Sequence, residues 1–570
     1  MKKLVSLFLA LCLCLSCTAA LADVADINKT EAVWPVSNGE KISVTIAVVP
    51  QMSGEYDVEN MWLTQLWDDM TNLDITWEVI ESSSAAEKIP LMMASGTMPD
   101  ALLGWYSFNQ SRLVQYGVDE GLLYPIDELL EYMPWFSKLL EDPARLSAVT
   151  APDGHIYGLP NLSDGSRATW QNRYAINHVW LENLGLEVPE TLDDLYTVLK
   201  AFKEQDANGN GDPNDEVPLT GSWNSGYQIR GRIQNALGFS TTGSSSTAAL
   251  LYKEDGSVEA VYIAATDLYK EYLAYMNKLW SEGLMDPDFF TQDMNQVNAK
   301  VTEHRAGMTS TDGIQAVDAT QEYDYTYLKP LTSEFNSKLI YPAASTVSNA
   351  GMFVINSDCD ETTAAALAKW ADSFFNPYCC ILYKYGPTYS ETETLMTEYG
   401  ELFSSEYGQY WDKEQGTNIY VFDTNVYPSN WEWRCKQMSF WAYPGYACNG
   451  NDEWWQMYAE AFPTTRIGME NIAKIEGKVK SSQLFEHGYA NWSEYFTPML
   501  PNFYYSTEDL AIVNDISVVL NDYVKAHEAK FVTGELNLES DYEAFQKGLK
   551  DYGVDEYVEI LQKYWAAYNK

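Results

Sequence analysis

Val44-Thr-Ile-Ala-Val-Val-Pro50 is an apolar run rich in β-branched residues, and it predicts a buried strand near the start of the folded chain. A helical pattern around Met61–Met70 follows it, and then a second strand-like run at Ile75–Ile80. A strand, a helix and a strand in this order form a βαβ unit, which joins two parallel strands. We therefore predict an α/β sheet.

After this βαβ unit, turn signals separate further short elements. Leu91–Leu103 predicts a helix that ends at Gly96, a turn at Pro99-Asp100 and then a buried strand. Pro152-Asp-Gly154 predicts a tight turn. The first third of the chain is therefore expected to alternate strands with short helices.

Helices with clear end signals dominate the second half of the chain. Thr191 and Asp194 form a capping box in front of an apolar stripe at helical spacing. Thr266–Gly283 brackets a second helix, and Ser506–Gly534 predicts a third, long one with a glycine stop. The second half is therefore predicted to be helix-rich.

Composition narrows the class of function. The chain has 570 residues, of which 46% are hydrophobic and 21% charged, so it is long and apolar enough to fold. Its 36 basic and 81 acidic residues give a formal charge of −45, which argues against binding nucleic acid or an anionic membrane surface. The 19 Trp and 40 Tyr exceed what a core needs, and they suit a wet surface that grips a flat ligand.

The amino terminus predicts export. Met1–Lys3 is positively charged, Leu4–Leu15 is apolar, and Ala20–Ala22 is a small-residue cleavage signal, so residues 1–22 resemble a secretory signal peptide. The apolar run is too short to span a bilayer core of ~30 Å. We expect an extracellular, cell-surface or periplasmic protein. Acylation at Cys17, which would anchor the chain to lipid, is the alternative to cleavage after Ala22.

Residues 206–216, Asp-Ala-Asn-Gly-Asn-Gly-Asp-Pro-Asn-Asp-Glu, form a calcium-type loop. Oxygen-bearing side chains stand at positions 1, 3 and 5 with Gly at position 6, as a Ca²⁺ loop requires. Position 12 is Val217, so a complete EF-hand is not supported, and a polar Asn/Gly turn is the alternative. We predict a structural Ca²⁺ bound by Asp206, Asn208, Asn210, Asp212, Asp215 and Glu216.

Six blocks in order carry a family resemblance. They are Ala94–Asp100, Ala151–Pro160, Asn177–Leu192, Ala201–Pro218, Leu279–Asp288 and Lys530–Asn537. Together they resemble the extracellular solute-binding proteins of bacterial ABC importers, in the long sugar-binding branch that includes the alginate-binding proteins. The resemblance is weakest at about residues 380–500, which hold a Trp-rich insert.

The resemblance implies an α/β, two-lobe periplasmic-binding-protein-like fold with a hinge, an interlobe cleft and a helix-rich second lobe. It also implies a carbohydrate ligand clamped by hinge closure, a structural Ca²⁺ and delivery to the permease subunits of the importer. We expect a monomer. The expected segments are a signal peptide at 1–22, an extended leader at 23–42, an N-terminal lobe at 43–165 plus roughly 315–400, and a C-terminal lobe at 166–314 plus roughly 401–570.

A sugar presents apolar C–H faces and a rim of hydroxyls, so its site needs aromatic platforms and directed polar groups. Candidates near the expected cleft segments are Trp105, Tyr106, Trp170, Arg173, Trp223, Tyr227, Trp431, Trp433, Trp441 and Tyr443. Ordinary packing stays open for each of them. An arginine such as Arg173, Arg230 or Arg232 would receive the carboxylate of an acidic sugar.

Enzymatic function is the rival interpretation. A secreted glycoside hydrolase needs two suitably spaced carboxylates, and with 81 acids a pair can always be proposed, so this carries no weight. GxSxG, HExxH and phosphate-loop motifs are absent from the sequence. We therefore predict a binding protein and no catalysis, and a peptide or signalling ligand stays open beside a neutral or acidic sugar.

Overall fold

The computed structural model describes most of the chain. The described residues are 23–52, 54–162, 174–223, 229–243, 247–310, 321, 324–343, 347–376, 379, 383, 408–412, 417–421, 432, 435–436, 440, 445–446 and 493–569. Among the described residues, no helix is long and apolar enough to cross a membrane.

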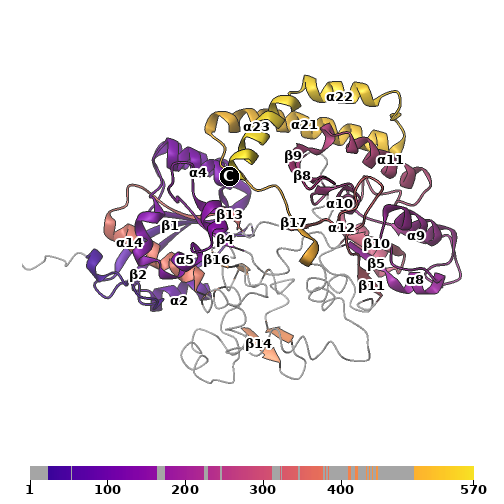
Figure 1. Cartoon of the computed structure of the whole chain (residues 1–570). Helices are drawn as coiled ribbons and strands as arrows, with labels where there is room; N and C mark the ends of the chain where they lie inside the picture. Colours follow the sequence, from indigo (N-terminus) through magenta and orange to yellow (C-terminus); the bar gives the residue numbers. More distant parts are fainter. Residues whose placement is uncertain are drawn as a thin grey trace, which may run out of the picture. The chain divides into compact units, whose positions relative to one another are not determined.

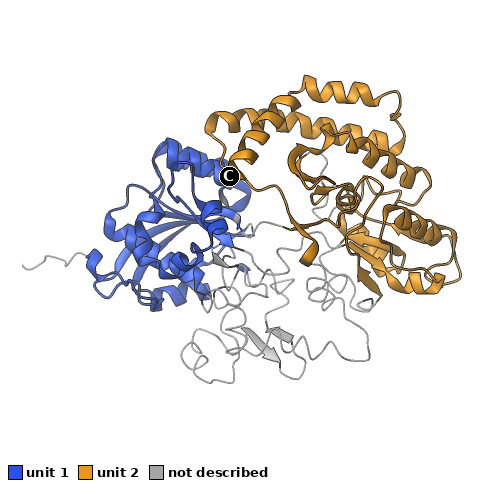
Figure 2. Ribbon diagram, in the orientation of Figure 1, with its two compact units in different colours: residues 1–162, 347–448, 454–464 blue, residues 163–346, 449–453, 465–570 orange. Residues whose placement is uncertain are grey.

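The chain divides into two compact units, coloured separately in Figure 2. Unit 1 comprises residues 1–162, 347–448 and 454–464, and unit 2 comprises residues 163–346, 449–453 and 465–570. The chain leaves unit 1 after Leu162 and re-enters it at Val347, where the strand Val347–Ile355 begins.

Unit 1 is built on a six-stranded sheet in the order β16-β4-β13-β3-β1-β2 (Figure 1). Its strands are β1 (Ile42–Val49), β2 (Leu73–Val79), β3 (Ala101–Phe108), β4 (Leu159–Leu162), β13 (Val347–Ile355) and β16 (Gly445–Tyr446). Strands β1, β2 and β3 are parallel, with Ile42 opposite Leu73 and Val48 opposite Leu103. Helix α2 (Trp62–Met70) joins β1 to β2, so the predicted βαβ unit is confirmed.

Helices and short turns cover the sheet of unit 1. They are η2 (Val58–Asn60), η3 (Ser82–Ser84), α3 (Ala85–Ser95), α4 (Gln110–Leu113), η4 (Val114–Asp119), η5 (Ile126–Tyr132), α5 (Pro134–Leu139), α6 (Pro143–Val149), α14 (Glu361–Asp372) and η8 (Ser373–Phe375). Helix α3 ends at Gly96 in the left-handed conformation, as predicted. The core is aromatic where Trp67 of α2 meets Trp370 of α14 edge-to-face, with ring centroids 5.0 Å apart.

The leader packs against unit 1. After the turn η1 (Val24–Asp26), Lys29 pairs with Glu131 at 2.6 Å, and Lys369 of α14 donates to the Thr30 carbonyl at 2.6 Å. Val36 is fully buried. Residues 23–42 have little regular structure. They are nevertheless part of the folded lobe, because Lys29 and Thr30 contact residues more than a hundred positions away in the sequence.

Unit 2 holds a four-stranded sheet in the order β11-β5-β10-β6 and a three-stranded sheet in the order β7-β8-β9. The first contains β11 (Tyr325–Tyr327), β5 (Tyr174–Asn177), β10 (Ala306–Ser310) and β6 (Val217–Leu219), and the second contains β7 (Phe239–Ser240), β8 (Ala248–Tyr252) and β9 (Val258–Tyr262). Strand β10 runs parallel to β6 and antiparallel to β5. A two-stranded pair in unit 2 is β12 (Tyr341–Ala343) with β17 (Phe496–Pro498), and a separate pair in unit 1 is β14 (Gly408–Asp412) with β15 (Thr417–Val421).

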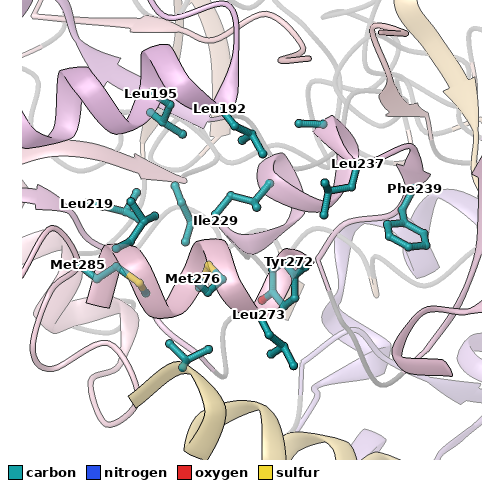
Figure 3. Close-up of a cluster of buried hydrophobic side chains, with 14 of the residues drawn as sticks. Leu192, Leu195, Leu219, Ile229, Leu237, Phe239, Tyr272, Leu273, Met276 and Met285 are labelled. Carbon is teal, nitrogen blue, oxygen red and sulfur yellow. The ribbon is translucent and has the colours of Figure 1, made fainter. Parts of the chain in front are cut away.

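Unit 2 carries the longer helices, which confirms the helix-rich second lobe. The helices and helical turns of unit 2 are α8 (His178–Leu184), α9 (Leu192–Glu204), α10 (Arg230–Ala236), η6 (Ile263–Ala265), α11 (Leu268–Ser281), α12 (Met294–Thr302), η10 (Ser493–Tyr495), α21 (Thr507–Thr533), α22 (Tyr542–Asp551) and α23 (Val554–Tyr568). The Thr191–Asp194 capping box is present, and Gly534 ends α21 at φ +80°. Figure 3 shows the core between α9, α10 and α11, where Leu195, Ile229 and Met276 belong to one buried cluster.

Candidate functional site

The four-stranded sheet of unit 2 has one edge where three strands end and one begins. Leu219 of β6, Ser310 of β10 and Tyr327 of β11 are the last residues of their strands, and Tyr174 is the first residue of the antiparallel β5. We call this the carboxyl edge of unit 2. In open α/β sheets, ligands bind outside the carboxyl ends of the strands. The sheet topology therefore makes this edge the candidate ligand site of unit 2.

The segment that leaves β6 at this edge is held by a buried polar network. Thr220 Oγ1 donates to Asp286 Oδ2 at 2.6 Å, and Gln292 Nε2 donates to the Gly221 carbonyl at 2.6 Å. Lys300 Nζ lies 2.8 and 2.7 Å from the two oxygens of Asp286. Burial alone would raise the pKa of Asp286, but the hydrogen bonds from Lys300, Thr220, the Asp288 amide and Gln292 together outweigh it and lower that pKa. The segment is thus fixed before any ligand arrives.

Trp223, a predicted sugar platform, lies at the end of this fixed segment and is 8% exposed. The Arg230 guanidinium stands over its ring at 3.8 Å from the centroid, and Phe290 packs against it at 4.8 Å. These contacts are internal to unit 2. Trp223 therefore packs with Arg230 in this structure.

Arg230 itself is neutralised by a distant acid. Its Nη1 lies 3.1 Å from Glu528 Oε1 of α21, and both side chains are 5% exposed or less. Tyr272 donates to the same oxygen at 2.6 Å, and Tyr269 donates to Oε2 at 3.1 Å. Sequence reasoning missed Glu528 because it lies 298 positions from Arg230 and no motif marks it. An arginine held in this way is not available to a ligand carboxylate.

Unit 1 has an equivalent carboxyl edge. Strands β1, β2 and β3 end there, β4 ends there at Leu162, and β13 begins there at Val347. Trp105 and Tyr106 lie in the second half of β3, next to this edge. They follow Gly104, whose φ is +151° and where an added Cβ would lie 2.5 Å from the Val49 carbonyl oxygen. Only glycine allows β3 to approach β1 so closely at this point.

Seven of the ten predicted ligand-binding residues lie outside the described part of the chain. These are Trp170, Arg173, Tyr227, Trp431, Trp433, Trp441 and Tyr443. Arg173 directly precedes Tyr174, the first residue at the carboxyl edge of unit 2. The structure thus brings Trp223 to one edge and the backbone of Trp105 and Tyr106 to the other.

The predicted calcium loop joins α9 to the start of β6, so it lies at the opposite end of that strand from the carboxyl edge. The loop is folded on its own polar groups. Asp206 Oδ2 accepts from the Gly211 amide at 2.9 Å, and the two oxygens of Asp215 accept from Asn208 Nδ2 at 3.1 Å and Asn210 Nδ2 at 2.8 Å. Its place in the fold suits a structural ion rather than one that contacts the ligand.

Two buried oxygens test whether this loop fits a cation. Asp206 Oδ1 and Glu216 Oε2 have no hydrogen-bond partner among the described residues, and Glu216 is 4% exposed. Burial raises the pKa of Glu216. Unsatisfied buried carboxylate oxygens are costly, and a hard cation with oxygen ligands would satisfy them. Each of these two oxygens therefore has the chemistry that a Ca²⁺ ligand requires.

The remaining predicted ligands fit less closely. Asp212 is exposed, and its Oδ1 accepts from the amide of Asn214 at 3.1 Å. Asn208 and Asn210 turn amide nitrogens toward Asp215, and an amide flip would present their oxygens instead. No group of three or more His, Cys, Asp or Glu side chains is close enough to hold a metal within the described ranges.

Comparison with known proteins agrees with this architecture. Residues 60–373 match the family described as bacterial extracellular solute-binding protein. The fructooligosaccharide ABC transporter substrate-binding protein FusA of Streptococcus pneumoniae serotype 4 (strain ATCC BAA-334 / TIGR4) is 28% identical over 536 residues, which cover 90% of this chain and 88% of FusA.

Solved structures show the same fold. An S. pneumoniae FusA EF-hand mutant in complex with fructo-nystose has a TM-score of 0.66 at 23% identity and covers 92% of this chain and 99% of its own. The HMO-binding ABC-transporter-associated protein of Bifidobacterium longum infantis ATCC 15697 has a TM-score of 0.70 at 21% identity, with 93% and 100% covered. The alginate-binding protein AlgQ2 without calcium ion has a TM-score of 0.61 at 19% identity, with 95% and 100% covered.

The two-lobe fold and the predicted family are therefore both confirmed, because the family match spans more than half of the chain and these structures cover nearly all of it. This chain belongs to the bacterial extracellular solute-binding protein family.

Proposed function

We propose that this protein captures an oligosaccharide outside the cell and delivers it to the permease subunits of an ABC importer. The observation that carries this proposal is the likeness to FusA, a fructooligosaccharide-binding transporter component, along 90% of the chain. The HMO-binding and alginate-binding proteins share the fold and also take oligomeric or polymeric sugars by name. The excess of Trp and Tyr suits such a ligand.

The two carboxyl edges are the proposed ligand-binding surfaces. The chain leaves unit 1 after Leu162 at the end of β4 and returns at Val347 at the start of β13, so both connections begin at the edge next to Trp105 and Tyr106. In unit 2, the first connection leads to Tyr174 at the carboxyl edge. A ligand that contacts both units only in a closed state would shift the population toward that state. Hinge closure is the proposed capture step.

Capture by this mechanism needs no bond cleavage, so the proposed function is binding without catalysis. Residues 1–22 are proposed to direct export, with lipid attachment at Cys17 as the alternative to cleavage after Ala22. The loop at 206–216 is proposed to hold one structural Ca²⁺, supported by the unsatisfied oxygens of Asp206 and Glu216. A monomer is proposed to be the working form.

A thermal-shift screen tests the proposal. The purified protein is heated with kestose, a human-milk tetrasaccharide, alginate and galacturonan oligomers, monosaccharides, and short peptides. We expect the melting temperature to rise with an oligosaccharide class and not with peptides, since only the folded protein binds its ligand. A shift with peptides alone, or the appearance of cleaved sugar products, would contradict the proposed function.

A further inference from the structure

Arg232, in α10, is a fully buried cation without a counter-ion in the described structure. Its side chain is 0% exposed. Nη2 donates to the Leu328 carbonyl at 2.9 Å, but Nε and Nη1 have no hydrogen-bond partner among the described residues. No acidic side chain of those residues pairs with it. Arg230, which lies two positions earlier in the same helix, is paired with the carboxylate of Glu528.

The guanidinium retains a complete pair of donors. Arginine has five N–H groups in one plane, and Nη2 carries two of them. One Nη2 hydrogen points the same way as Nε–H and the other the same way as an Nη1 hydrogen. Whichever of the two the Leu328 carbonyl accepts, the other forms a two-donor fork with Nε or Nη1. That fork matches the two oxygens of a carboxylate.

The surroundings place this fork at the carboxyl edge of unit 2. The guanidinium carbon lies 4.4 Å from the ring centroid of Tyr174 and 4.6 Å from that of Tyr341. Tyr174 begins β5, and Leu328 directly follows β11. Ser310, the last residue of β10, is paired directly with Tyr174. Arg232 therefore lies where the strands of unit 2 end.

Ser310 adds a second unsatisfied group. Residues directly opposite each other in an antiparallel pair direct their side chains to the same face of the sheet, so Ser310 shares a face with Tyr174. Ser310 is 1% exposed, and its Oγ has no hydrogen-bond partner in the part of the chain that the structure describes. A hydroxyl and a guanidinium fork at the same edge are suited to a ligand that brings oxygen acceptors.

The positive charge of Arg232 distinguishes between a neutral and an acidic ligand. Burying a cation away from water is costly unless an anion is paired with it, and contact with two tyrosine rings compensates only part of that cost. A neutral sugar hydroxyl would accept one hydrogen bond and leave the charge uncompensated, whereas a carboxylate would satisfy both the fork and the charge. We propose that Arg232 receives a carboxylate of the ligand, and thus that the ligand class is an oligosaccharide containing a uronic acid. This inference rests on the proposed function.

Calorimetric titration with matched ligands tests the inference. Trigalacturonate and trimannuronate are each compared with their neutral methyl esters, and kestose serves as a neutral oligosaccharide. We expect a uronate trisaccharide to bind at least about 100-fold more tightly than its ester, as a charge-assisted bidentate pair allows. Arg232→Gln should abolish this preference, and Arg232→Lys, which keeps the charge but loses the fork, should weaken it. Arg145→Gln in α6 is the control and should bind as the unchanged protein does.

The outcomes separate the inference from the proposed function. Binding of kestose or of the esters with an affinity equal to that of the acids, unchanged in Arg232→Gln, would overturn the role of Arg232 and leave sugar capture standing. Binding of none of these saccharides would overturn both. Stability without ligand gives an independent readout: Arg232→Met should keep or raise the melting temperature, because it removes an uncompensated charge. A marked fall in melting temperature with unchanged ligand preference would assign Arg232 to the core instead.

Discussion

Chelating Ca²⁺ with EGTA is predicted to lower the melting temperature of this protein without unfolding it at room temperature. The reason lies in Asp206 Oδ1 and Glu216 Oε2, two buried carboxylate oxygens without a hydrogen-bond partner among the described residues. Leaving a buried polar group unsatisfied costs about 1–3 kcal/mol, so two such oxygens give roughly 2–6 kcal/mol that a bound cation would recover.

The affinity for Ca²⁺ gives a second value for this stabilisation free energy, in the same range. If the loop binds Ca²⁺ with a Kd of roughly 10 µM, about 1 mM Ca²⁺ stabilises the folded state by about 2.7 kcal/mol. For a unit of this size, with an unfolding entropy of about 2.1 cal/mol/K per residue, a change of that magnitude shifts Tm by about 4–5 °C. Differential scanning calorimetry in Ca²⁺ and in EGTA measures the shift directly.

Two variants test whether the calcium-dependent shift in melting temperature comes from this loop. Asp206→Asn should abolish the calcium-dependent shift, because it weakens the ligand at the first loop position. Asp255→Asn is the control: Asp255 is an acid in another exposed, glycine-containing turn of unit 2, where it accepts from the Ser257 amide at 2.9 Å, and its variant should keep the full shift. Equal melting temperatures in Ca²⁺ and EGTA for the unchanged protein would refute the assignment of this loop.

The pH dependence gives a further check on the same site. Burial raises the pKa of Glu216, so without Ca²⁺ the folded state holds this proton more tightly than the unfolded state. The stability that it contributes is present below the unfolded pKa, about 4.3, and is lost as pH rises through the folded pKa. With Ca²⁺ the carboxylate must be ionised to bind, so the trend should reverse. The same slope in Ca²⁺ and in EGTA would contradict ligation by Glu216.

Three further predictions concern the scaffold. Glu528→Ala leaves Arg230 buried without its partner and should cost about 3–5 kcal/mol in urea unfolding; a loss below about 1 kcal/mol would contradict the network. Burial raises the pKa of Asp372 to about 7, so the stability that protonated Asp372 contributes should fall as pH rises from about 4 through 7. Asp372→Asn should flatten this pH dependence of Tm in thermal melts, and an unchanged pH dependence would contradict the raised pKa. Gly351→Ala would place a Cβ 2.4 Å from the Phe108 carbonyl and should lower Tm by several degrees, and an unaltered Tm would show that β13 can move away.

Local patterns predicted the elements that depend on nearby residues. The β1–α2–β2 unit follows from apolar periodicity, and the Thr191–Asp194 box is present because capping involves residues three positions apart. The family resemblance added the two-lobe organisation, which periodicity alone cannot supply.

Contacts between distant residues could not be predicted. Strand β13 lies between β3 and β4 in the sheet, so the chain re-enters unit 1 at Val347. The sequence of a strand does not predict which strands it pairs with. The same holds for Glu528 and Arg230, and for the leader, whose polar composition hides its contacts with α14. The sequence marks Trp223 only as an aromatic near a cleft segment, whereas the structure shows the Arg230 guanidinium over its ring.

Isothermal titration of the purified protein with the oligosaccharide that gives the largest thermal shift, followed by chromatography of the recovered sugar, decides whether this chain binds a sugar without cleaving it. We predict one ligand bound per chain, with the sugar recovered intact, because capture requires closure and no bond cleavage. A titration curve that gives no defined ratio of ligand to protein, or shortened sugar products after incubation, would contradict a solute-binding function for this chain.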